Sequence, residues 1–179
     1  MLNLSENNCA ASTLVLGLGN RFMSDDGVGP RLIDCLTEQF KGYPGTEFLD
    51  LGTNAMAMLP KLKGQKKLIL IDCANIKESP GQMRSFSLAQ VRSQKSKLHF
   101  SMHQIDLMQV MDLGASLGRL PEEVLIFGIQ PLSIEPGENL SFEVAAGFES
   151  YVKNIAAEVS KGLEKGIQPL LQDQNVLHL

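Results

Sequence analysis

The segment Leu14-Val15-Leu16-Gly17-Leu18-Gly19-Asn20 is followed closely by Ser24-Asp25-Asp26-Gly27-Val28-Gly29, and together they indicate the fold. A short apolar run that ends in glycines is typical of a buried parallel strand and the turn after it. The two acids come next, at the start of an amphipathic pattern. The segment therefore predicts a strand over residues 13–19, a glycine turn, and a helix from about Asp26 to Phe40.

Two later apolar runs also end at an acid, Phe48-Leu49-Asp50 and Leu68-Ile69-Leu70-Ile71-Asp72. In an open parallel sheet the carboxyl ends of the strands share one edge, and sites in such folds lie at that edge. We therefore expect Asp50 and Asp72 to gather there with Asp26. Three carboxylates at one sheet edge favour a metal site or an acid/base site over a nucleotide cradle.

Apolar strand patterns and helical patterns alternate along the rest of the chain. We expect strands over about 47–50, 67–72, 83–88 and 124–129, and helices over about 55–62 and 103–117. A final helix begins after Ser141, a plausible N-cap, while 89–99 and 130–140 are predicted loops and about 165–179 a tail. The alternation predicts one domain with a core over about 13–160. Its fold is doubly wound three-layer α/β/α, with a mostly parallel five-stranded sheet and one antiparallel edge strand at 83–88.

Composition narrows the class of protein. The 179 residues are 44% hydrophobic and 20% charged, with a net charge of −4, so neither nucleic acid nor a membrane is an expected partner. Cys9, Cys35 and Cys73 form no C-x-x-C pair, which argues against a zinc ribbon or a disulfide framework and fits a reducing cytoplasm. Residues 1–13 lack the features of a signal peptide.

The glycine turn invites a dinucleotide-binding interpretation. That fingerprint needs a third glycine three positions after Gly19, where this chain has Phe22. We therefore interpret Gly17 and Gly19 as a tight turn that carries the chain across the sheet edge.

Each acid also has a structural alternative. Asp25 and Asp26 are well placed to cap a helix, and Asp50 could cap the helix near Ala55. Asp50-Leu51-Gly52-Thr53 has the wrong order for the Asp-Thr-Gly of aspartic proteases, and no second copy exists. Asp72 is the most telling, because an acid directly after a buried strand costs solvation unless it is paired, metal-bound or exposed.

His103 is the histidine that could join these acids. An imidazole with two carboxylates, and a position open to water or substrate, suits zinc, nickel or a similar divalent ion. A single histidine near a helix start is also common as a purely structural residue, and spacing alone does not separate the two interpretations.

Taken together, these motifs resemble those of the hydrogenase maturation proteases over about residues 13–160. The likeness runs through an ordered series of short motifs: Leu16-Gly17-Leu18-Gly19-Asn20, Asp25-Asp26-Gly27-Val28-Gly29, Asp50-x-Gly52-Thr53, Asp72 closing its strand, Ser101-x-His103-Gln104, and Gly128-x-Gln130-Pro131 with Glu135-Pro136. The resemblance implies that Asp26, Asp72 and His103 contact a metal ion, with Asp50 as a supporting or catalytic acid.

The resemblance also implies an activity. Members trim the C-terminus of the large subunit of [NiFe] hydrogenases, so the expected partner is a large-subunit precursor. The expected ion is nickel carried by that precursor, with no organic cofactor, and the expected enzyme is an aspartic-type or metal-dependent peptidase. Independently of the resemblance, the unpaired cysteines favour the cytoplasm, and we expect a monomer because no exposed apolar seam stands out in the sequence. Two alternatives stay open: a metallopeptidase that owns its zinc, and a nickel-sensing chaperone that binds the precursor without cutting it.

Overall fold

The computed structural model describes residues 12–41, 45–93, 99–100 and 104–172. Its main sheet has the strand order β2-β1-β3-β6-β4. The strands are β1 (Thr13–Gly17), β2 (Thr46–Asp50), β3 (Lys67–Asn75), β4 (Met83–Ser87) and β6 (Glu123–Ile129). The first three and β6 are parallel, and β4 pairs antiparallel at the edge. This confirms the predicted fold class.

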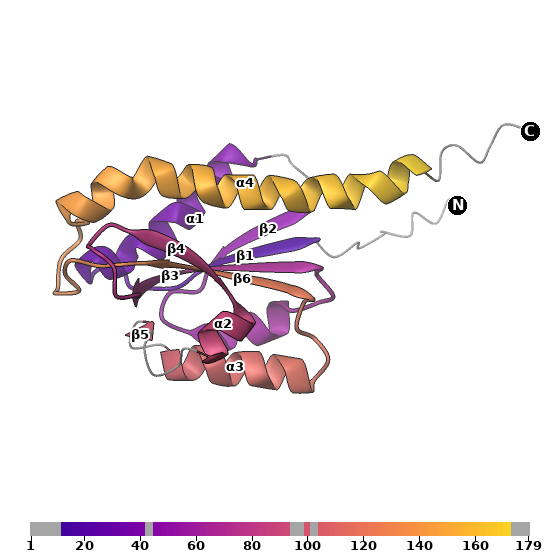
Figure 1. Ribbon diagram of the computed structural model, residues 1–179, viewed down its shortest axis with the longest axis horizontal. Helices are drawn as coiled ribbons and strands as arrows, with labels where there is room; N and C mark the ends of the chain where they lie inside the picture. The colour runs from indigo at the N-terminus through magenta and orange to yellow at the C-terminus, as the bar shows by residue number, and fades with distance from the viewer. Residues whose placement is uncertain (1–11, 42–44, 94–98, 101–103, 173–179) are drawn as a thin grey trace, which may run out of the picture.

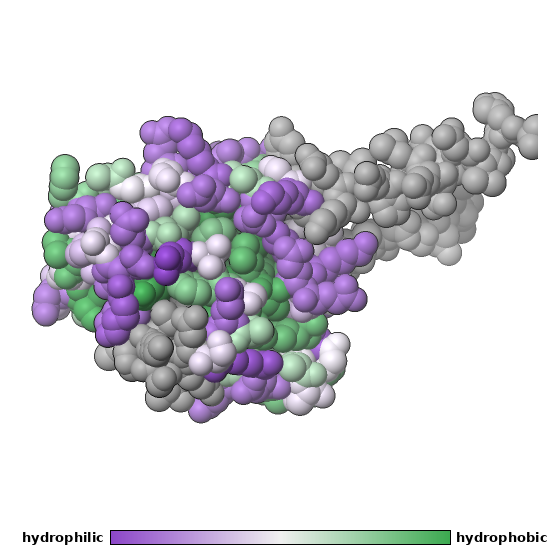
Figure 2. Space-filling view, viewed as in Figure 1, coloured by the Kyte–Doolittle hydropathy of each residue, from purple (hydrophilic) through white to green (hydrophobic). Residues whose placement is uncertain are grey.

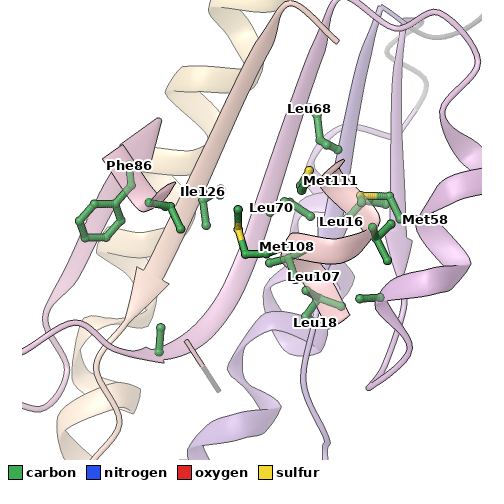
Figure 3. Packing of buried hydrophobic residues seen from close by; sticks show 14 of the residues in the cluster. Leu16, Leu18, Met58, Leu68, Leu70, Phe86, Leu107, Met108, Met111 and Ile126 are labelled. Atoms are coloured by element: carbon green, nitrogen blue, oxygen red, sulfur yellow. The ribbon is translucent and has the colours of Figure 1, made fainter. Parts of the chain in front are cut away.

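Helices cover both faces of the sheet (Figure 1). One face carries α1 (Val28–Gln39) and α4 (Phe142–Gln172), and the other carries the 3-10 helix η2 (Ala55–Lys61), α2 (Leu88–Ser93) and α3 (Gln104–Ser116). Alternate residues of the central strands point to opposite faces, so Ile69 joins the α1/α4 core and Leu70 joins the α3 core. Figure 3 shows Met108 and Met111 of α3 packed beside Leu70.

Strand β3 continues past the predicted end. It was expected to stop at Asp72 but runs to Asn75, and Cys73 and Ala74 are buried like the strand before them. The end of β3 is paired with two other strands. Asp72 and Cys73 pair with β6, and Ala74 and Asn75 pair with the two-residue strand β5 (His99–Phe100). Asp72 therefore lies inside a strand.

The prediction of a loop over 89–99 is wrong in its first half, because residues 88–93 form α2. Its start is a capping box: the Ser87 N–H donates to Gln90 Oε1 at 2.8 Å, and the Gln90 N–H donates to Ser87 Oγ at 3.3 Å. The S-x-x-Q pattern of Ser87 and Gln90 is a helix-start signal in the sequence, but the polar residues around it led to the prediction of a loop.

Two helix boundaries also differ from the prediction. The helix expected from Asp26 begins instead as a 3-10 turn, η1 (Ser24–Gly27), which leads into α1. The last helix continues through Gln172, so residues 165–172 are helical where a tail was expected. Its predicted N-cap is confirmed, since the Val144 N–H donates to Ser141 Oγ at 3.4 Å. None of the helices in the described part of the chain has the length and apolar character needed to cross a bilayer.

Candidate active site

The predicted acids lie at the carboxyl end of the parallel strands. Gly17, the last residue of β1, is in register with Asp50 on one side and Ile71 on the other. Asp72 is one residue farther along β3, opposite Gly128 of β6. Both acids therefore lie at the edge that the sequence predicts.

Asp50 and Asp72 nevertheless point to opposite faces of the sheet. Ile71 belongs to the α1/α4 core, and Asp50 shares its row and hence its face. Asp72 follows Ile71 and points to the α3 side, the side of Leu70 and Ala74. Because β1 lies between β2 and β3, the backbones of the two acids are also about 10 Å apart. Asp50 therefore stands apart from Asp72.

Asp26 is the acid that lies near Asp72. η1 contacts β3, and both side chains are almost fully buried, with 7% of Asp26 and 1% of Asp72 exposed. The Cys73 thiol, next to Asp72 in the sequence, lies close enough to both acids for their charges to affect its pKa. Its pKa is raised first by burial and then by the negative charges of Asp72, Asp26 and Asp25. Three carboxylates thus act on one sulfur at this end of the sheet.

The glycine turn brings Asp26 into place. The Asn20 N–H donates to Asp26 Oδ2 at 2.7 Å. Gly19 has a φ of +133°, and a Cβ there would lie 1.8 Å from the Asp26 carbonyl oxygen, so only glycine permits this approach. The turn interpretation of Gly19 is confirmed, because this glycine serves the fold of the acid segment.

Asp25 has a structural role that differs from helix capping. Neither η1 nor α1 is capped by a side chain. Instead the fully buried Asp25 carboxylate accepts hydrogen bonds from the loop after β6, at 2.6–3.0 Å: the N–H groups of Leu132, Ser133 and Ser141 and the hydroxyl of Ser141. The neighbouring main chain adds a bond from the Asp25 N–H to the Ser133 carbonyl at 3.1 Å. Asp25 therefore fastens residues 131–141 to η1.

Asp50 takes part in an ion-pair network on the α1 side. Arg21 donates to Asp50 Oδ2 at 2.9 Å through Nη2 and at 3.3 Å through Nε, and to both carboxylate oxygens of Asp34 at 2.6 and 3.0 Å. These contacts raise the pKa of the guanidinium and lower the pKa of Asp34. Arg21 and Asp50 line a cavity of about 270 Å³ together with Gly19, Phe22 and Thr53.

Two of the sequence motifs shape the chain around the acids. In Asp50-x-Gly52-Thr53, Asp50 Oδ1 accepts the Gly52 N–H at 2.8 Å, and the Gly52 carbonyl accepts the Gly19 N–H at 2.9 Å. This Asx turn joins the β2 end to the glycine turn. Gln130 ties the end of β6 to the segment after β3, since its Oε1 accepts the N–H of Ile76 at 2.9 Å.

His103 lies outside the described residues, and α3 begins at the next residue, Gln104. Within the part of the chain that the structure describes, no group of three histidine, cysteine or acidic side chains is arranged to hold a metal ion. Of the three residues predicted as ligands, Asp26 and Asp72 lie within the described part of the chain.

Comparison with known proteins identifies the family. The model for a family described as hydrogenase maturation protease matches residues 30–158. The chain belongs to this family. Asp50, Asp72 and His103 fall within the matched segment, whereas Asp26 precedes it.

Individual members agree with the family match. The Hydrogenase 2 maturation protease of Escherichia coli is 28% identical over 158 residues, which cover 88% of this chain and 94% of that protein. The hydrogenase expression/formation protein HoxM of Azotobacter vinelandii is 29% identical, over 78% of this chain and 68% of its own length. Among solved structures, the hydrogenase maturating endopeptidase HybD from E. coli superposes with a TM-score of 0.75 at 30% identity, covering 83% of this chain and 92% of that one.

The structure adds two residues that sequence reasoning did not assign to the site, Arg21 and Asp25. We call the hydrogen bonds between the Asp25 carboxylate and the loop of residues 131–141 the clasp. Asp25 was considered only as a helix cap. Arg21 had no local signal, because its two acid partners are 13 and 29 residues away in the sequence. Long-range ion pairs of this kind are invisible to a pattern read within one segment.

Proposed function

We propose that this protein is an endopeptidase that removes a C-terminal peptide from the precursor of a [NiFe] hydrogenase large subunit. Its membership of the hydrogenase maturation proteases supports the reaction and the partner. The observation that carries the proposal to particular residues is the pair of buried acids, Asp26 and Asp72, brought to one sheet edge from segments 46 residues apart. We further propose that the enzyme is a monomer and that it is cytoplasmic; the free thiols of Cys35 and Cys73 support the cytoplasmic location.

Nickel carried by the precursor serves as the recognition handle in this proposal. Asp26, Asp72 and His103 approach the ion, which brings the scissile bond to the sheet edge. His103 is assigned as the third ligand because it directly precedes α3, and α3 packs on the face toward which Asp72 points. Two carboxylates and an imidazole suit a divalent ion that keeps further positions for its own thiolate ligands.

Hydrolysis itself requires a water, a base and a protonated leaving group. The water oxygen bonds to the scissile carbonyl carbon, the C–N bond breaks, and the water proton ends on the leaving amine. Asp50 is the acid that we assign to proton handling or support. It is a poor candidate for the same ion as Asp72, because β1 separates the two residues and they face opposite sides of the sheet. Arg21 holds the Asp50 carboxylate in one orientation.

The direct test is to incubate the protein with the large-subunit precursor, with and without nickel, and to measure intact masses. We expect loss of a C-terminal peptide only from the nickel-loaded precursor. Cleavage of both forms, with zinc bound stoichiometrically to the purified protein, would indicate a metallopeptidase that owns its metal. A stable complex without loss of mass would indicate a chaperone.

Variants assign the roles. We expect Asp72→Asn, Asp26→Asn and His103→Ala to slow processing by about 10²-fold or more, the scale of losing a group that acts on the reacting centre. The matched control is Asp112→Asn, which removes a charge from an exposed acid of α3 that pairs with Arg92 of α2. Circular dichroism verifies that each variant is folded. Wild-type processing by Asp72→Asn or His103→Ala would contradict the assigned ligands.

A further inference from the structure

The carboxyl end of the sheet carries exposed apolar side chains that the proposed chemistry does not use. Such side chains are costly when they gather on a free surface, and gathered apolar surface commonly marks a binding site. Four of them belong to the segments that Asp25 fastens together, and they are 46–83% exposed: Phe22, Leu132, Ile134 and Phe142. We call these four side chains the apolar rim.

Hydrogen bonds bring the segments of the apolar rim together. The N–H groups of Leu132 and of Ser141, the residue before Phe142, both donate to the Asp25 carboxylate, at 2.9 and 2.6 Å. The Phe22 carbonyl accepts the Gly137 N–H at 2.9 Å, and Ser24 donates its N–H to the Gly137 carbonyl at 2.7 Å. Residues 22–24 and 132–142 therefore form one supported platform. In Figure 2, hydrophobic side chains are visible among hydrophilic ones at this end of the molecule, near the start of α4 in Figure 1.

The platform is continuous with the candidate site. Phe22 also lines the cavity that contains Arg21 and Asp50. Asp26 follows Asp25 directly, so the residue that holds the platform is the neighbour of a proposed ligand.

The charges on the platform narrow the kind of partner. Residues 131–145 contain three charged side chains, all acidic and all exposed: Glu135, Glu138 and Glu143. Of the nearby cations, Arg21 pairs with Asp34 and Asp50, and Arg31 donates to the Glu138 carbonyl. An apolar surface with an acidic border is complementary to an apolar peptide that also carries lysine or arginine.

We infer that the apolar rim and its acidic border dock a segment of the precursor that combines apolar and basic side chains, next to the bond that is cut. This inference rests on the proposed function. The rim supplies binding and takes no part in the chemistry, so its loss should affect half-saturation and leave the turnover rate unchanged.

The test compares the double variant L132S/F142S with wild type in precursor processing and, separately, in precursor binding by biolayer interferometry. We expect KM to rise at least about tenfold, the scale of losing two apolar contacts, with kcat within about twofold of wild type. The triple variant E135Q/E138Q/E143Q should also raise KM, and 0.5 M salt should abolish the difference between this variant and wild type. L117S is the matched control, an equally exposed leucine that follows α3 at the opposite end of the sheet, and should leave KM unchanged.

The possible outcomes distinguish a failure of the docking surface from a failure of the proposed function. If wild type cleaves the precursor and L132S/F142S has an unchanged KM, the docking surface is overturned and the proposed function stands. If wild type binds but does not cleave, the proposed function fails, and weaker binding by L132S/F142S still supports the docking surface. If sedimentation shows a wild-type dimer that L132S/F142S dissociates without a change in KM, the rim is a contact between two copies of this chain, and the inference is overturned.

Discussion

The two ends of the sheet both bury charged side chains, but they hold these charges in different ways. At the amino end, Lys67 is 4% exposed, and its Nζ lies 2.8 Å from a carboxylate oxygen of Glu123 and 2.8 Å from one of Glu158. At the carboxyl end, the buried Asp25 is held by three main-chain N–H groups and one hydroxyl. One end therefore cancels charge with charge, and the other satisfies a carboxylate with neutral donors.

This difference in how the charges are satisfied separates the two ends of the sheet by their charge balance. Lys67 joins β3 to β6 and α4 through opposite charges, so these charges compensate one another. At the carboxyl end, burial raises the pKa of the Cys73 thiol first, and the negative charges of Asp72, Asp26 and Asp25 raise it further, so like charges lie near one another there. Concentrated like charge costs stability, and it agrees with the cation contact that we propose for Asp26 and Asp72.

Loss of the Asp25 carboxylate should destabilise the carboxyl end of the sheet more than loss of Lys67 destabilises the amino end. We expect Asp25→Ala to lower the free energy of unfolding by about 3 kcal/mol, because buried N–H donors of Leu132, Ser133 and Ser141 lose their acceptor. Urea denaturation followed by circular dichroism measures this change. The loop of residues 131–141 should also become more sensitive to limited proteolysis.

Two variants control this experiment. Asp25→Asn keeps one acceptor oxygen in place and should lose less stability than Asp25→Ala. Glu149→Gln alters an exposed acid of α4 paired with Lys153 and should change stability by less than about 0.5 kcal/mol. A stability of Asp25→Ala within about 1 kcal/mol of wild type would mean that the clasp is not what holds the loop.

The sequence is most informative where structure is local. The apolar runs of β1, β3 and β6 predict buried parallel strands, because both faces of such strands are covered. The alternation over 83–88 predicts an edge strand, and the structure confirms it there as β4. The end of β3 was predicted too early, because an acid after an apolar run resembles a strand end even when the strand continues.

The candidate site could be predicted only in part, since its geometry depends on long-range contacts. The edge at which Asp50 and Asp72 lie follows from parallel strand ends, but their opposite faces follow from the register with β1. The separate roles of the neighbours Asp25 and Asp26 depend on a loop more than 100 residues away. No pattern within one segment contains these facts.

The ion pairs of Lys67 stabilise the amino end of the sheet. We expect Lys67→Met to cost about 1–2 kcal/mol at pH 7, because two carboxylates lose their cation although both remain partly exposed to solvent. Lys161→Met is the matched control, as Lys161 pairs with the same Glu158 from an exposed position and should cost less. Urea denaturation of both variants measures the difference. Equal costs would show that the burial of Lys67 adds nothing to its ion pairs.

The same group of charges has a defined pH window. Burial of Lys67 lowers its pKa, but the hydrogen bonds to Glu123 and Glu158 outweigh this and raise the pKa above its ordinary value of 10.5. The hydrogen bonds from Lys161 and Lys67 lower the pKa of Glu158 below 4.5. The lysine contribution is present below 10.5 and lost as the pH rises through the raised pKa, and the Glu158 contribution is present above 4.5 and lost as the pH falls. Stability measured between those limits should therefore show a constant cost of Lys67→Met.

Asp34, also near the carboxyl end, should contribute less to stability than Asp25 or Lys67. Asp34 orients Arg21, which in turn holds Asp50, but the Asp34 side chain is mostly exposed. We expect Asp34→Asn to change the free energy of unfolding by less than about 1 kcal/mol, since exposed ion pairs contribute little. Precursor processing should fall by a few-fold at most, because Arg21 keeps its bonds to Asp50 and to the Pro30 carbonyl.

Two features make the Asp34 effect distinguishable from a general loss of charge. Glu38→Gln is the matched control, an exposed acid of the same helix paired with Lys41, away from Arg21. Arg21 lowers the pKa of Asp34 below its ordinary 3.8, so the contribution of Asp34 is present above that value and is lost only as the pH falls through the lowered pKa. The ratio of wild-type to Asp34→Asn processing should therefore be constant between about pH 5 and 8. A larger loss in Asp34→Asn than in Glu38→Gln, with kcat reduced and KM unchanged, would mean that the Arg21 network orients Asp50 for the chemical step, whereas equal effects would leave the network a support for the turn.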